Sequence, residues 1–204
     1  MTGKKQAAIF AVLLLIGGFL LILPCRGGIT FLYALLYVLL NLAYSFKLKH
    51  IAIIDCFCIA GGFILRILAG GAAIDDVVSE WLFLTMITAS LFMAFGKRRG
   101  EMIRITDTGA TRKVLANYDV AFLNGMVFVC AGLSIVFYSL WSMAHNVSAM
   151  IYTVPLVIYI IAKYLLIIHD KTSHGDPTSV ILADKGLIIA LGILGLSSII
   201  LLYL

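Results

Sequence analysis

Long apolar segments separated by short polar ones dominate this sequence of 204 residues. A helix needs roughly 20 mostly apolar residues to cross a bilayer. About seven segments approach that length, at residues 7–24, 29–46, 51–72, 79–95, 120–140, 148–168 and 186–204. They are continuously apolar rather than alternating, which favours helices over strands in lipid. We therefore predict an all-α, polytopic transmembrane helix bundle, formed by one domain over residues 1–204.

The composition excludes several other classes of protein. The chain is 63% hydrophobic and 12% charged, whereas soluble domains carry roughly twice that share of charged residues. Its net charge of +5 comes from basic residues in short loops, which is typical of membrane orientation and does not indicate nucleic-acid binding. The four cysteines lie in or beside apolar segments, so we interpret them as core thiols without disulfides.

The loop charges predict an orientation. Basic residues concentrate on one side of the expected spans, and the acidic residues near Asp75 lie on the other side. The positive-inside rule places the basic side, and with it the N-terminus, in the cytoplasm. The polar segments 45–50, 96–119 and 169–185 then share the cytoplasmic face. We expect a multi-pass protein of a bacterial plasma membrane whose active face is cytoplasmic.

Three polar clusters on that face are candidate sites. In the first, Tyr44 ends one expected span, Lys49 opens the next, and Asp55 lies about one and a half turns inside it. An aromatic belt with interfacial lysines would explain Tyr44 and Lys49 without any function. A carboxylate inside a span is costly, however, so Asp55 should have a partner or a role.

The second cluster follows an uncharged apolar stretch and contains Lys97, Arg98 and Glu101. On a helix, both cations would neighbour Glu101, at spacings of four and three residues. An arginine fork and a lysine point charge suit phosphate oxygens, and the carboxylate suits a metal ion. The alternative is membrane anchoring by the cations with a local ion pair.

The third cluster lies at 169–185, where Asp176 or Thr178 would cap a helix after a turn. A helix start is a fair anion site, although a plain connecting turn explains the same residues. Arg66, inside the third expected span, is interpreted as structural: it would extend toward the outer interface or pair with Asp75 or Glu80.

Together these residues resemble a known family. The matching positions are Tyr44, Ser45, Leu48, Lys49 and Asp55; Gly61, Phe63, Leu65, Arg66, Ala69 and Gly70; Ser79 and Trp81; Gly96, Lys97, Arg98 and Glu101; and Gly175, Asp176, Pro177, Thr178 and Asp184. In order and spacing they resemble the UbiA-type prenyltransferase superfamily. The similarity is greatest to its decaprenyl-phosphate phosphoribosyltransferase branch, because Lys97, Arg98 and Glu101 stand where other members carry a second aspartate-rich motif.

The resemblance implies a nine-helix fold of which this chain holds the helices from the third onward. The family's first aspartate-rich motif, which binds Mg²⁺, has no counterpart in the sequence. On this reading a second chain or a homo-oligomer supplies the missing helices. An alternative that the absent motif leaves open is a non-catalytic or truncated membrane subunit.

The resemblance also implies a reaction. A phosphoribosyl group would move from phosphoribosyl pyrophosphate to a polyprenyl (decaprenyl) phosphate lipid, with Mg²⁺ as cofactor, in cell-envelope arabinan precursor synthesis. The alternative enzyme is a UbiA-type prenyltransferase with a prenyl diphosphate donor and another acceptor. The implied roles are catalysis for Glu101 and Asp55, metal binding for Glu101, and substrate binding for Tyr44, Lys49, Lys97, Arg98 and Asp176.

Overall fold

The computed structural model is helical throughout the part of the chain that it describes, apart from connecting turns. It describes residues 6, 17–18, 28–108, 115–144, 148–169 and 181–203. The expected first span at 7–24 lies almost wholly outside these residues, and so does Asp176. The main helices are α2 (Gly28–Phe46), α3 (Ile54–Ala73), α4 (Glu80–Thr108), α5 (Val120–Ala144), α6 (Val154–His169) and α8 (Lys185–Tyr203).

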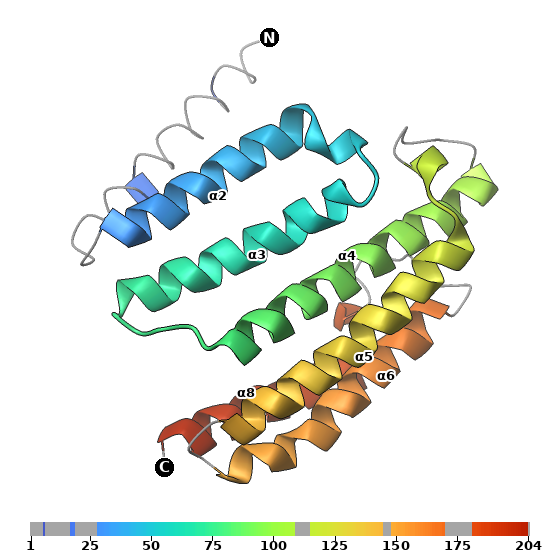
Figure 1. Ribbon diagram of the computed structural model, residues 1–204. Helices are drawn as coiled ribbons and strands as arrows, with labels where there is room; N and C mark the ends of the chain where they lie inside the picture. The colour runs from blue at the N-terminus through green and yellow to red at the C-terminus, as the bar shows by residue number, and fades with distance from the viewer. Residues whose placement is uncertain are drawn as a thin grey trace.

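Helices that follow one another along the chain pack side by side. Figure 1 shows α2, α3 and α4 in a row, with α5, α6 and α8 gathered on the far side of α4. Buried side chains of α3, α4, α5 and α6 meet in one apolar core. The longest helix, α4, therefore lies between the α2–α3 pair and the remaining helices.

The helices confirm the predicted membrane-type bundle. Among the described residues, four are long and apolar enough to cross a bilayer, and the helix at Lys185–Leu201 is apolar but shorter. The four are Gly28–Phe46, Ile54–Ala73, Val120–Ala144 and Ala149–His169. Large apolar side chains on their outer faces remain exposed, as expected of surfaces that lipid covers.

The polar segment that begins at Gly96 is helical in its first part. Helix α4 continues without a break from Glu80 to Thr108. Lysine, arginine, glutamate and methionine, which fill this stretch, are good helix formers, and no proline interrupts it. The second polar cluster is therefore mounted on a continuous helix rather than on a loop.

The connection from α2 to α3 is tight and strained. A short 3₁₀ turn at Leu48–His50 leads to Ile53, whose φ of 69° is rare for a β-branched residue. Helix α3 begins at Ile54, so Asp55 lies in its first turn, not one and a half turns inside it. A carboxylate is stabilised there by the N-terminal end of the helix dipole.

The last turn of α3 packs closely against the connection that follows it, and this packing can be tested by a substitution. A Cβ at Gly71 would lie 2.9 Å from the carbonyl oxygen of Asp76, whereas one at Gly70 would meet nothing within 4 Å. Gly71→Ala should therefore lower the thermal unfolding midpoint of the detergent-purified protein by several degrees, followed by circular dichroism. Gly70→Ala is the matched control and should leave the midpoint almost unchanged. Equal midpoints for the two variants would contradict the packing of this turn.

Candidate functional site

A buried ion pair joins α3 to α4. Arg98 Nε lies 2.5 Å from Asp55 Oδ2, and the two residues are 1% and 0% exposed. Removing both charges from water is expensive, so the pair persists only where hydrogen bonds satisfy their other polar atoms. The surroundings of both side chains meet that condition.

The guanidinium of Arg98 uses its other two nitrogens as well. Nη1 donates to Glu101 Oε2 at 2.5 Å, one helical turn further along α4. Nη2 donates to the hydroxyl of Tyr44 in α2 at 3.4 Å, the longest of its contacts. Arg98 thus ties together α2, α3 and α4. The Glu101 side chain is 23% exposed, so this end of the network reaches the surface.

The other carboxylate oxygen of Asp55 is held by Tyr118, which sequence reasoning missed. The Tyr118 hydroxyl donates to Asp55 Oδ1 at 2.7 Å and accepts the backbone N–H of the strained Ile53 at 2.6 Å. Burial, followed by the hydrogen bond to Asp55, raises the pKa of Tyr118 above its usual range, which keeps the phenol protonated. In the sequence, the one feature that could have pointed to Tyr118 is its position directly before the apolar segment at 120–140.

Arg99 faces the opposite side of α4 from Arg98. Its Nε donates to Asn124 Oδ1 in α5, and its Nη1 donates to the carbonyl oxygen of Ile168 near the end of α6, both at 2.5 Å. A cation at the carboxyl end of a helix is favourable for the helix dipole. Neighbouring arginines therefore have different partners: Arg98 binds toward α2 and α3, and Arg99 toward α5 and α6.

The structure brings four of the predicted site residues together: Tyr44, Asp55, Arg98 and Glu101. We call these four, together with Tyr118, the Arg98 network. Lys97 is half-buried on α4 directly before Arg98. Lys49 is exposed in the 3₁₀ turn between α2 and α3. Asp176 lies outside the described residues.

The carboxylates of this network determine how a metal ion could bind here. Among the described residues, no group of three or more His, Cys, Asp or Glu side chains comes together. Both oxygens of Asp55 accept hydrogen bonds, whereas Glu101 reaches the surface. Mg²⁺ commonly binds through one or two carboxylates with waters and substrate phosphates. Glu101 is therefore the carboxylate of this network that could take part in such a site.

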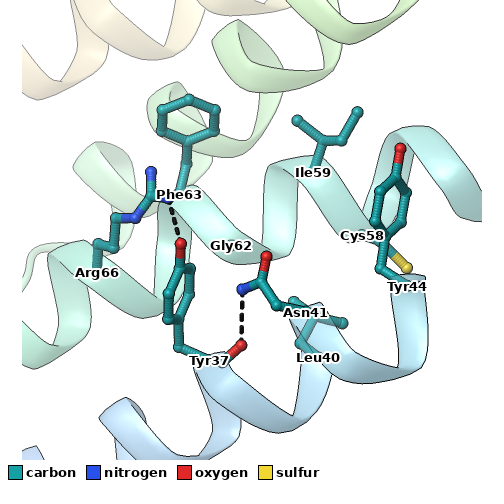
Figure 2. A pocket seen from close by; sticks show the side chains of 9 residues that line it. All are labelled: Tyr37, Leu40, Asn41, Tyr44, Cys58, Ile59, Gly62, Phe63 and Arg66. Carbon is teal, nitrogen blue, oxygen red and sulfur yellow. Dashed lines mark hydrogen bonds between the residues drawn. The ribbon is translucent and has the colours of Figure 1, made fainter. Parts of the chain in front are cut away.

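Two cavities flank α3 and α4. A cleft of about 160 Å³ between α2 and α3, lined by apolar and hydrogen-bonding side chains, starts at Tyr44 and ends at Arg66 (Figure 2). An apolar cavity of about 240 Å³ lies among α4, α5, α6 and α8. Side chains that line this second cavity include Phe92, Met93, Val157, Ile160, Ile161 and Leu191. Its lining is suited to a hydrocarbon group.

Comparisons with known proteins identify the family of the chain. The model of the UbiA prenyltransferase family matches residues 2–188. Decaprenyl-phosphate phosphoribosyltransferase of Mycolicibacterium smegmatis is 35% identical over 162 residues, which cover 73% of this chain and 51% of that protein. The proteins of the same name from Corynebacterium glutamicum and Mycobacterium tuberculosis are 36% and 31% identical, over 73% and 76% of this chain. The chain spans about half the length of the curated relatives it matches.

The burial of the ion pair predicts an asymmetric effect of two substitutions. Asp55→Asn removes the buried one of the two carboxylates that pair with the Arg98 guanidinium and should lower the free energy of unfolding by roughly 3–5 kcal/mol. Tyr118→Phe removes only one hydrogen bond to Asp55 and should cost about 1–3 kcal/mol. Thermal or denaturant unfolding in detergent measures both. An Asp55→Asn variant as stable as the wild type would refute the buried pair.

Proposed function

The chain belongs to the UbiA prenyltransferase family, and on that premise we propose that it transfers a phosphoribosyl group from phosphoribosyl pyrophosphate to a polyprenyl phosphate. The relatives named decaprenyl-phosphate phosphoribosyltransferase support the choice of donor and acceptor. The observation that carries the proposal is the Arg98 network, a buried and charged cluster in an apolar helix bundle. Charged groups at such a position are costly and are usually retained for function.

The two cavities support a reaction between a charged donor and a lipid acceptor. Phosphoribosyl pyrophosphate is water-soluble and reaches the protein from the aqueous side, and polyprenyl phosphate reaches it from the bilayer. The apolar cavity beside α4 suits part of the prenyl chain. The active face is cytoplasmic in this proposal, because the Arg98 network lies at the end of α4 that the loop charges assign to the cytoplasm.

The reaction is a substitution at the anomeric carbon of the ribose. An oxygen of the lipid phosphate forms the new bond to that carbon, and the bond to the pyrophosphate oxygen breaks with its electron pair on pyrophosphate. Negative charge therefore develops on the leaving group. Fixed cations aimed at this charge stabilise the transition state. Lys49 and Lys97, both at least partly accessible, are the point charges that we assign to the phosphates.

Arg98 and Asp55 contribute mainly by position. The weakest contact of Arg98 is the one from Nη2 to Tyr44, at 3.4 Å, so this nitrogen is the one we expect to exchange partners for a phosphate oxygen. Asp55, with both oxygens engaged, fixes the direction of that guanidinium. Asp176, in the segment 170–180, is a further proposed contact to the substrate.

Mg²⁺ is the proposed cofactor, and it would neutralise charge on the departing pyrophosphate. Glu101 is the residue that we expect to hold it, together with substrate phosphate oxygens. The salt bridge from Arg98 fixes one oxygen of Glu101. A carboxylate that is already oriented loses less entropy when it binds the metal ion.

The reaction is tested with the purified protein in lipid nanodiscs with Mg²⁺ and labelled phosphoribosyl pyrophosphate. Label should appear in polyprenyl phosphate and should require both substrates. Consumption of a prenyl diphosphate donor instead, with no labelled lipid phosphate, would replace the proposal with the alternative prenyltransferase activity. No turnover of either donor would contradict both activities for this chain.

Glu101→Gln should lower the rate of phosphoribosyl transfer by about a hundredfold or more, because loss of one electrostatic group at the reacting phosphates has effects of that order. The matched control is Glu80→Gln, which removes a carboxylate from the exposed opposite end of the same helix. Circular dichroism checks that both variants fold. A folded Glu101→Gln variant with the wild-type rate would exclude the metal or substrate role of Glu101.

A further inference from the structure

Arg66 is the one arginine or lysine inside the α3 segment that is long and apolar enough to cross a membrane. A cation in such a helix is costly unless it finds a partner. Such residues usually face a cavity or a binding partner rather than lipid. Arg66 borders the cleft between α2 and α3.

The partners of Arg66 differ from those expected from the sequence. Figure 2 shows the guanidinium turned toward α2, where Nη2 donates to the hydroxyl of Tyr37. The same group lies 4.8 Å from the ring centre of Tyr37 and 5.2 Å from that of Phe63. These contacts hold the cation over aromatic faces at the α2–α3 contact, although the Arg66 side chain is exposed. They do not place it on Asp75 or Glu80.

The charge of Arg66 is not balanced by a carboxylate in the described part of the chain. The ion pairs found there involve Arg98 and Lys163 instead. Residues 1–27, which precede α2, contain no Asp or Glu in the sequence. A hydroxyl and two aromatic rings orient a guanidinium but carry no opposite charge. The position is therefore suited to an anion.

Other donors line the same cleft. Tyr37, Asn41 and Tyr44 recur on one face of α2 at spacings of four and three residues. The Tyr37 hydroxyl accepts from Arg66, so its own proton is available to a further acceptor. Asn41 Nδ2 donates to the Tyr37 carbonyl oxygen at 2.8 Å and has a second N–H. Donors outnumber acceptors around the cation, as in sites that bind phosphate oxygens.

We infer that this cleft binds the phosphate monoester head group of a lipid before it reaches the Arg98 network. The inference rests on the proposed function, whose acceptor has this chemistry. Between Tyr37 and Tyr44 the face of α2 covers about 10 Å of helix axis, and Tyr44 contacts both the cleft and Arg98. The cleft therefore leads from the membrane interior to the candidate site along a row of hydrogen-bonding groups.

The surroundings favour a lipid over a soluble anion as the source of the phosphate. Apolar side chains of both helices, Leu40, Ile59 and Phe63, line the cleft as well, and Phe63 is exposed at its edge. A soluble phosphate would have to enter the apolar region alone, at a high desolvation cost. A lipid phosphate arrives with a hydrocarbon chain that can lie against these side chains.

The test is a binding measurement that does not depend on turnover. Wild-type protein and Arg66→Gln in nanodiscs of zwitterionic lipid are titrated with a polyprenyl phosphate and with the matching uncharged polyprenol. Arg66→Gln should weaken binding of the polyprenyl phosphate about tenfold or more, since hydrogen bonds to charged groups contribute on that order. The polyprenol should bind weakly and equally to both proteins. Equal affinity of both proteins for the polyprenyl phosphate would overturn the inference.

Matched variants keep the result interpretable. Lys163→Gln removes a cation from another apolar helix, where it pairs with Asp184, and should bind the lipid phosphate as the wild type does. Tyr37→Phe and Asn41→Leu retain the charge of Arg66 and should each weaken binding, which covers the case in which Arg66→Gln fails to fold. Unchanged affinity in both of these variants would contradict the proposed lining of the site.

Competition distinguishes the sources of the anion and separates this inference from the proposed function. Inorganic phosphate at millimolar concentration should not displace the polyprenyl phosphate, and displacement would assign the cleft to a soluble anion instead. Lipid binding that depends on Arg66 in a protein without transferase activity would support the cleft and contradict the proposed function. If the protein is active but Arg66→Gln leaves its lipid affinity unchanged, the result would support the proposed function and contradict the cleft as a binding site.

Discussion

The buried ion pair between Asp55 and Arg98 is the interaction on which the rest of the structure depends. Neither charge has access to water, so each polar atom around them must find a partner within the protein. That requirement explains why Tyr118 reaches Asp55 and why Tyr44 lies against Arg98. It also accounts for the strained backbone at Ile53, whose N–H binds the Tyr118 hydroxyl and so contributes to orienting it.

Helix α4 connects the Asp55–Arg98 ion pair to the other helices of the bundle. Its continuous course past Gly96 carries Arg98 toward α2 and α3, and Arg99 toward α5 and α6. Two adjacent arginines therefore bind α4 to the helices on either side of it, at the same position along its axis. Fixed charges of this kind are what preorganisation of a site requires. Arg66 is different, since it is oriented by aromatic rings in a cleft that remains open.

The sequence predicted the helical membrane fold and four members of the Arg98 network, because apolar length and intramembrane charge are local signals. It did not predict Tyr118 or the separate roles of Arg98 and Arg99. Those depend on which helix faces each side chain, which a single sequence does not encode locally. The helix after Gly96 agrees with the helical spacing on which the second cluster was argued, and lysine, arginine and glutamate favour helices. The roles assigned to all of the candidate site residues remain predictions.

The central claim is that Asp55, although sealed from water, controls substrate binding through Arg98. Its most direct test is the affinity of folded Asp55→Asn, Arg98→Gln and the double variant for phosphoribosyl pyrophosphate with Mg²⁺, measured by calorimetry in nanodiscs. The account predicts that each single variant loses most of the affinity and that the double variant binds no more weakly than the weaker single one, because both act through one guanidinium. Wild-type affinity in the folded Asp55→Asn variant would contradict it.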